Sequence, residues 1–179
     1  MRATAWTSKP GLAGEAEGNC VEARAMTDSA ALIYLARRDV SPQWRGFLQA
    51  LIGTLGANMD MAGRNALLRA VGGRMAADAP LRTAATLEEL ELAMNEALGA
   101  MAWGYLSLRL DETDRSLRLV HAALPCIPAP GDPEGAWLAE VLEGLYDTWL
   151  TVQQGGASAG VRLALVQAAP GHAVFRFGG

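Results

Sequence analysis

The chain of 179 residues contains few of the residue types that build catalytic or metal sites, with only two cysteines and two histidines. Cys20 and Cys126 lie far apart and lack the C-x-x-C spacing of zinc and redox motifs, so the pattern predicts two free thiols. His121 and His172 have no second histidine or paired cysteine at ligand spacing, which favours ordinary core or surface histidines. We therefore expect no metal site and no cofactor.

Long apolar runs and an excess of basic residues are also missing. No apolar run reaches the roughly 20 residues that a membrane-spanning helix needs, and the first residues lack the apolar core of a secretory signal. This pattern predicts a cytoplasmic protein. The net charge of -4 gives nucleic acid no electrostatic footprint, so we expect no nucleic-acid partner and favour a neutral or basic one.

What is present is an apolar composition, 51% hydrophobic and 19% charged. A chain of this length suits one domain that buries roughly 70% of its unfolded surface, and the apolar excess predicts burial in an oligomer interface. Residues 1–25 are rich in glycine, alanine and glutamate without a sustained period, which predicts a disordered extension. Helix-capping residue types follow Met26, which raises the hypothesis that the native product begins there and that 26–179 form the single domain.

Apolar residues recur at helical spacing in several segments. A first helix is expected after Met26, and Thr86 with Glu89 forms a capping box at the start of a later one. The pair Gly72-Gly73 is expected to weaken or kink the end of the helix that contains it. The helices after the first are predicted over 42–55, 63–77, 86–101 and 137–152.

Two hairpins follow from runs in which apolar and polar residues alternate. The first joins strands 105–110 and 116–120 through a charged turn, and the second joins 161–166 and 173–177 about Pro170-Gly171. In the first hairpin, Leu106, Leu108 and Leu110 are expected on one face with Leu117 and Leu119. The proline-rich stretch 124–135 is either an ordered crossing loop or a flexible lid. The order of elements predicts an α+β fold with several amphipathic helices and an antiparallel sheet made of two hairpins.

Two motifs have both a functional and a structural interpretation. Residues 156–160 match the G-x-S-x-G nucleophile elbow around Ser158, but a helix precedes the motif and a strand follows it, which is the reverse of the elbow. We therefore do not favour a hydrolase. Tryptophan can stack on sugar rings, yet the helical spacing of Trp137 and Trp149 predicts core packing. Trp44, near a helix start, is the best candidate ligand contact.

From Pro42 to Gln153 the chain resembles the family of the D subunit of bacterial cellulose synthase. The motifs that carry the resemblance are 44–51, 64–72, Trp103-Gly104, 116–121, Leu124-Pro125 and 137–146. The resemblance implies a non-catalytic accessory subunit of cellulose biosynthesis, an oligomeric scaffold that organises glucan chain export or synthase complexes so that crystalline cellulose forms. It also implies a cylindrical homo-octamer built as a tetramer of dimers.

The resemblance further implies three kinds of partner: other copies of the chain, β-1,4-glucan chains and other components of the synthase complex. It places the protein near the inner-membrane synthase, in the cytoplasm or alternatively in the periplasm. Family contacts to glucan involve the amino-terminal region, which corresponds by position to Arg37, Arg38 and Trp44. Here the arginines are expected to donate to sugar hydroxyls and Trp44 to stack, whereas the structural alternative is a polar helix end followed by a core tryptophan.

Two rival functions remain open. A peptide-binding adaptor or chaperone of a secretion system would be a monomer or dimer whose helix stripe takes a partner segment. An esterase would lose turnover on Ser158→Ala.

Overall fold

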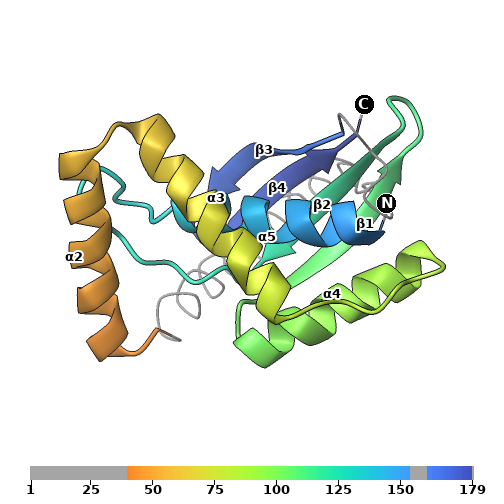
Figure 1. The fold of residues 1–179 in the computed structure, drawn as a ribbon, viewed down its shortest axis with the longest axis horizontal. Coiled ribbons are helices and arrows are strands. Elements are labelled where there is room, and N and C mark those ends of the chain that lie inside the picture. Colours follow the sequence, from red (N-terminus) through yellow and green to blue (C-terminus); the bar gives the residue numbers. More distant parts are fainter. Residues whose placement is uncertain (1–39, 154–160, 179) are drawn as a thin grey trace, which may run out of the picture.

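The computed structural model describes residues 40–153 and 161–178, which form four helices and one antiparallel sheet in an α+β arrangement (Figure 1). The predicted first helix, the possible start at Met26, Cys20 and the Ser158 motif all lie outside the described residues. The helices are α2 (Pro42–Asn58), α3 (Met61–Asp78), α4 (Leu87–Met101) and α5 (Leu138–Gln153). The strands are β1 (Tyr105–Asp111), β2 (Ser116–Ala122), β3 (Leu163–Ala169) and β4 (His172–Phe177). Each predicted element within this range is confirmed, with small shifts in its ends.

The sheet, α5 and α3 stack as three layers, with α3 in front of α5 in Figure 1. Helix α5 is the centre of the core, because it presents apolar residues to the sheet on one side and to α3 on the other. The two helices approach closely at Gly72 and Gly144. A Cβ at Gly72 would lie 1.9 Å from the carbonyl oxygen of Val141, and one at Gly144 would lie 1.9 Å from that of Arg69.

The Gly72-Gly73 pair, which was expected to weaken or kink the end of α3, does not interrupt the helix. The helix runs unbroken from Met61 to Asp78, and Gly72 is buried within it. Glycine lowers intrinsic helix propensity by about 1 kcal/mol relative to alanine, but here its missing side chain allows the backbones of α3 and α5 to touch. Tertiary packing therefore outweighs the local propensity.

The four strands lie in the order β1-β2-β4-β3, so the two predicted hairpins join through β2 and β4. Leu108 pairs with Leu119 and Leu110 pairs with Leu117, so these leucines share one face of the sheet, as predicted. Leu110 nevertheless is 63% exposed, because it lies near the turn end of the hairpin, beyond the region that α4 covers. A register shift between Leu165 and Gln167 marks a β-bulge in the edge strand β3.

Helix α4 covers the opposite edge of the sheet, where its side chains make hydrogen bonds to the backbone of β1 in the place of a neighbouring strand. The amide of Asn95 accepts from the backbone N–H of Leu106 at 2.8 Å and donates to its carbonyl oxygen at 2.9 Å. One turn earlier, Glu91 accepts from the N–H of Leu108 at 2.6 Å. An edge strand with unpaired backbone groups invites pairing with other chains, and these contacts block that part of β1.

The proline-rich stretch 124–135 is an ordered crossing loop. Cys126 and Ile127 are buried, and the indole of Trp137 donates to the carbonyl of Ile127 at 2.9 Å. Asp132 accepts from the backbone N–H groups of Ala136 and Trp137, which start the turn that leads into α5. Trp137 and Trp149 are 4% and 2% exposed, so their predicted core role is confirmed. Cys126 is a free thiol, as predicted.

Candidate interaction surface

Helix α2 stands at one end of the molecule, on the left in Figure 1, with much of its apolar surface uncovered. Ser41 caps its N-terminus and Pro42 occupies the first turn, which is a favourable position for proline. Trp44 and Phe47 are 57% and 56% exposed and meet edge to face at 5.8 Å. Of its residues, only Ile52 is fully buried. A helix so weakly anchored yet so apolar is typical of an interface element.

An apolar groove of about 550 Å³ lies between α2 and the rest of the domain. Leu48, Leu51 and Leu55 form the α2 wall, and Leu67 and Val71 of α3 form part of the facing wall. Trp103 and Trp137 also line the groove. Of these α3 residues and their neighbour Leu68, only Leu68 is buried, whereas Leu67 and Val71 are exposed along the groove.

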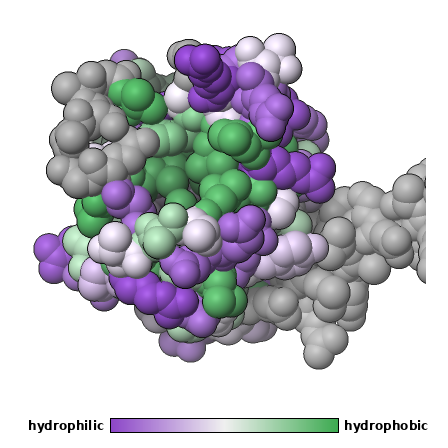
Figure 2. Space-filling model, turned by 90° about the vertical axis from the view of Figure 1, so that its right-hand side faces the viewer, coloured by the Kyte–Doolittle hydropathy of each residue, from purple (hydrophilic) through white to green (hydrophobic). Residues whose placement is uncertain are grey.

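A second apolar surface lies at the opposite end of the molecule. Figure 2, a view from the right-hand side of Figure 1, shows hydrophobic side chains gathered in a hollow with a hydrophilic rim. The start of α4, the turn side of β1 and the end of α5 lie at this end (Figure 1). Each of these segments carries an exposed apolar residue, namely Leu92, Leu110 and Val152. The chain thus exposes apolar surface at both ends of its long axis.

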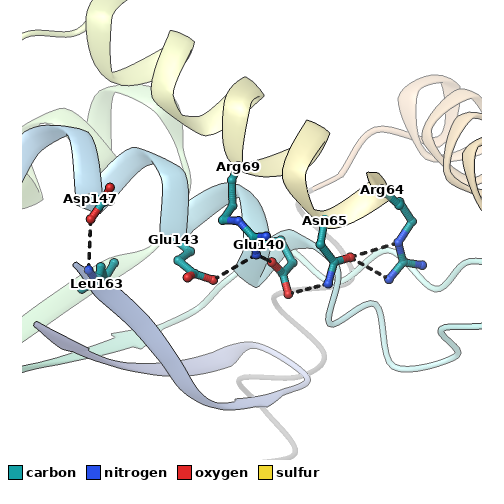
Figure 3. Close-up of polar contacts among 7 residues, drawn as sticks. All are labelled: Arg64, Asn65, Arg69, Glu140, Glu143, Asp147 and Leu163. Carbon is teal, nitrogen blue, oxygen red and sulfur yellow. Dashed lines mark hydrogen bonds and ion pairs between the residues drawn. The ribbon is translucent and has the colours of Figure 1, made fainter. Parts of the chain in front are cut away.

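Between the two ends, a polar cluster joins α3 to α5 (Figure 3). Arg69 forms an ion pair with Glu140 and lies 3.6 Å from Glu143, and Asn65 donates to Glu140 at 2.9 Å. Burial, with the neighbouring carboxylates of Glu140 and Asp147, raises the pKa of Glu143. Each partner of Arg69 sits beside the glycine crossing, so the cluster fixes how α3 lies on α5. Nothing in its geometry pairs an acid with a nucleophile.

His121 is the one fully buried histidine in the described part of the chain, so of its two predicted places, core or surface, it takes the core. Its Nδ1 shares a 2.7 Å hydrogen bond with the Tyr146 hydroxyl, and its Nε2 has no partner among the described residues. Burial, together with the charge of His172, lowers the pKa of His121 to about 4. Burial also raises the pKa of Tyr146. The pair is sealed from solvent and therefore from any substrate.

The predicted glucan-contact residues are only partly within the described structure. Arg37 and Arg38 lie outside it, while Trp44 lies in the first turn of α2 and lines the groove. The alternative of a core tryptophan is wrong for Trp44, because its side chain is more than half exposed. The stacking role itself stays a prediction.

Neither a metal-binding cluster nor a membrane-spanning helix is found among the described residues. Residues 40–153 and 161–178 hold no group of three or more histidine, cysteine or acidic side chains placed to bind a metal ion. In the same ranges, no helix combines the length and the apolar character required to cross a bilayer.

Fold and surface together define an α+β protein with an apolar groove between a loosely attached helix and the rest of the domain. Residues 30–178 match the family model that describes the D subunit of cellulose synthase. Two "cellulose synthase operon protein D" sequences of Komagataeibacter xylinus are 39% identical over 117 residues and 40% identical over 114. The first alignment covers 65% of this chain and 75% of the relative, the second 64% and 73%. A Komagataeibacter sucrofermentans protein of the same name is 38% identical over 117 residues, with 65% and 75% covered.

The chain therefore belongs to the family of the cellulose synthase D subunit, as its motifs indicated. Membership supports a role in cellulose synthesis together with other components of the synthase. The regions of resemblance include α2, both glycines of the helix crossing and the loop that anchors Trp137.

Proposed function

We propose that this protein is a non-catalytic scaffold that assembles into a closed homo-octamer, a tetramer of dimers, and arranges glucan chains or synthase complexes so that crystalline cellulose forms. The observation that carries the proposal is the presence of two separate apolar surfaces. One self-complementary surface alone produces a dimer, whereas a second one joins dimers into a ring. The groove with the exposed face of α2 supplies the first surface, and the hollow at the Leu110 end supplies the second.

The apolar side chains of these two surfaces are exposed to solvent in the single chain, so burying them between copies would stabilise an assembly. Fully burying a leucine or phenylalanine side chain contributes about 1.5–3 kcal/mol, so Phe47 and Leu51 alone carry enough energy to matter in association. Our predicted location remains the cytoplasmic face of the synthase complex.

The test is complementation of a strain that lacks the gene. We expect the deletion to lower the crystallinity of secreted cellulose, measured by X-ray diffraction, while glucan polymerisation by membranes continues. The wild-type gene should restore crystallinity, and Phe47→Glu, which places a charge on the exposed face of α2, should not. Ala77→Glu adds the same charge at an exposed position of α3 and serves as the control. Loss of polymerisation itself in the deletion strain would contradict a scaffold role.

Contact with glucan through Arg37, Arg38 and Trp44 is a separate part of the proposal. The position of Trp44 beside an open groove supports it, because an indole face is available there. Replacing all three residues by alanine is expected to lower crystallinity while the oligomer stays intact. Unchanged crystallinity with an intact oligomer would eliminate these contacts.

The groove also supports the alternative of a peptide-binding adaptor. Its volume is within the roughly 300–1,000 Å³ of ligand sites, and an amphipathic helix is a common occupant of such grooves. An adaptor would stay monomeric or dimeric at concentrations where a scaffold is fully assembled.

A further inference from the structure

The sheet face that points away from α5 carries a row of three like charges. Arg109, Arg118 and Arg176 lie opposite one another in the register of β1, β2 and β4, and all three are exposed. Cross-strand partners have Cβ atoms about 4.5–5.5 Å apart, and like charges at that separation lower stability. We call this arrangement the arginine row. Repulsion among its charges lowers the stability of the free domain, and the strand register shows no contact that offsets this loss.

Little in the described part of the chain neutralises the arginine row. Asp114 lies 3.5 Å from Arg176 in an exposed ion pair. Arg109 and Arg118 form no ion pair or hydrogen bond with any described residue. Helix α5 packs on the other face of the sheet and α4 on its edge, so no described helix covers the row. The row is a surface of concentrated positive charge on an acidic protein.

The residues on either side of the arginine row limit the shape of a partner that could bind it. On one side, Ser107, Val120 and Val174 form the next row across the strands, and all three are half-buried. On the other side, the turn between β1 and β2 carries Glu112 and Asp114. A broad anionic surface, such as a membrane or duplex DNA, would press its own charges against these carboxylates. A narrow rod that follows the row meets only Asp114, at the Arg176 end, where the two side chains already form an ion pair.

We propose that the arginine row and its apolar neighbour row bind an amphipathic acidic helix of a partner protein. Side chains at i, i+3 and i+4 on a helix lie about 5–6 Å apart, close to the spacing of about 4.7–4.9 Å between strands. An acidic stripe can thus pair with Arg109 and Arg118 and extend to Arg176, beside its ion pair with Asp114. An adjacent apolar stripe can cover Val120 and Val174. Guanidinium–carboxylate pairs are frequently bidentate, which fixes the direction of the helix. The inference goes beyond the proposed function and does not depend on the number of copies in the assembly.

Binding is tested with the full-length protein and a fluorescent synthetic helix of about five turns that has a leucine stripe beside a glutamate stripe. We expect saturable binding that weakens with salt and an affinity at least about tenfold lower for Arg109→Gln/Arg118→Gln, because two charged hydrogen-bonded pairs are lost. The matched control, Arg74→Gln/Arg82→Gln, removes two exposed arginines elsewhere and the same charge. It should bind as the wild type does.

Three results would overturn the proposal. The first is equal affinity of Arg109→Gln/Arg118→Gln and the wild type, and the second is equal affinity for a peptide of the same composition with its two stripes intermixed. The third is tighter, arginine-dependent binding to phosphatidylglycerol vesicles or to single-stranded DNA than to the helix. Light scattering of each variant separates these outcomes from a failure of assembly, because the oligomer mass should not change.

A second measurement needs no partner. Arg118 lies between two other arginines, so Arg118→Gln should stabilise the free protein and lower its unfolding equilibrium constant by about twofold at low salt. Added salt should remove this stabilisation. Arg74 has Asp78 as its neighbour, so Arg74→Gln should raise the constant slightly. A higher unfolding constant for Arg118→Gln at low salt would overturn the proposal, since the row would then be neutralised within the free protein.

Discussion

At the scale of single residues, the buried pair of His121 and Tyr146 connects the sheet to α5 and makes stability depend on pH. The folded-state pKa of His121 is about 4, against 6.5 for the free side chain. The unfolded chain therefore takes up a proton near pH 6.5 while the folded chain does not, so stability is full above that pH and falls as the pH drops toward 4. The loss between pH 7 and pH 5 should be about 2 kcal/mol.

Urea denaturation at pH 7 and pH 5, at one fixed protomer concentration, measures this loss. His121→Leu removes the titrating group, so the difference between the two pH values should shrink by about the same 2 kcal/mol even if the variant is less stable overall. An unchanged pH dependence in the variant would assign the acid sensitivity to other groups.

The glycines at the α3–α5 crossing give a second residue-scale prediction. Gly144→Ala should destabilise the fold by about 3 kcal/mol, because its Cβ would overlap the backbone of Arg69. Gly99 of α4 has no atom within 4 Å of the equivalent position, so Gly99→Ala should stabilise by roughly 0.5–1 kcal/mol. The free energy of unfolding of each variant checks the pair, and equal effects of the two substitutions would refute the close crossing.

Individual residues also show which structural roles can be predicted from sequence patterns. The core roles of Trp137 and Trp149 could be predicted because a helical stripe is a local property. The role of Gly72 could not, because its partner, the backbone of α5, is some seventy residues away in the chain. For the same reason, propensity alone predicted a kink where the fold contains a contact.

At the scale of elements, the contact of α4 with β1 replaces a missing strand. Asn95→Ala should lower the free energy of unfolding by about 2 kcal/mol, since it removes both hydrogen bonds to the edge backbone of Leu106. Asn95→Asp keeps an acceptor for the N–H but sets a carboxylate oxygen against the carbonyl oxygen of Leu106, so its cost should be no smaller than that of Asn95→Ala. Chemical denaturation of the three proteins measures the order.

Asn58 provides the control for this series. Its exposed amide donates only to the carbonyl of Thr54 within α2, so Asn58→Ala should change stability by less than about 0.5 kcal/mol. A cost for Asn95→Ala no larger than for Asn58→Ala would show that the edge of β1 does not need the amide.

The strands show what the sequence could and could not reveal at this scale. The motifs Leu-Arg-Leu around Arg109 and Arg118 and Phe-Arg-Phe around Arg176 alternate with period two, which predicts each strand and its outward arginine. The arginine row was nevertheless missed, because it requires β2 to pair with β4. That pairing joins strands of different hairpins and depends on the order β1-β2-β4-β3.

At the scale of the whole molecule, apolar surface at two opposite ends is the feature that relates the fold to its role (Figures 1 and 2). The apolar composition predicted self-association, but it could not separate the interface from the core. Leu67 and Val71 have the periodicity of core residues and yet line an open groove. Only the position of α2, held away from α3, distinguishes them.

The two ends should act independently in assembly. Phe47→Glu disrupts one surface and Leu110→Glu the other, so each single variant should form a smaller complex than the wild type and the double variant should be a monomer. Ala77→Glu should assemble normally. Sedimentation velocity of the four variants and the wild type checks this prediction, and full assembly of the double variant would show that neither surface is an interface.

The most direct test of the scaffold is the mass of the wild-type protein in solution, measured by multi-angle light scattering over a range of concentrations. The scaffold account predicts a single species of eight times the 18.9 kDa chain mass that persists on dilution. A stable monomer that shows no self-association at any concentration would contradict it.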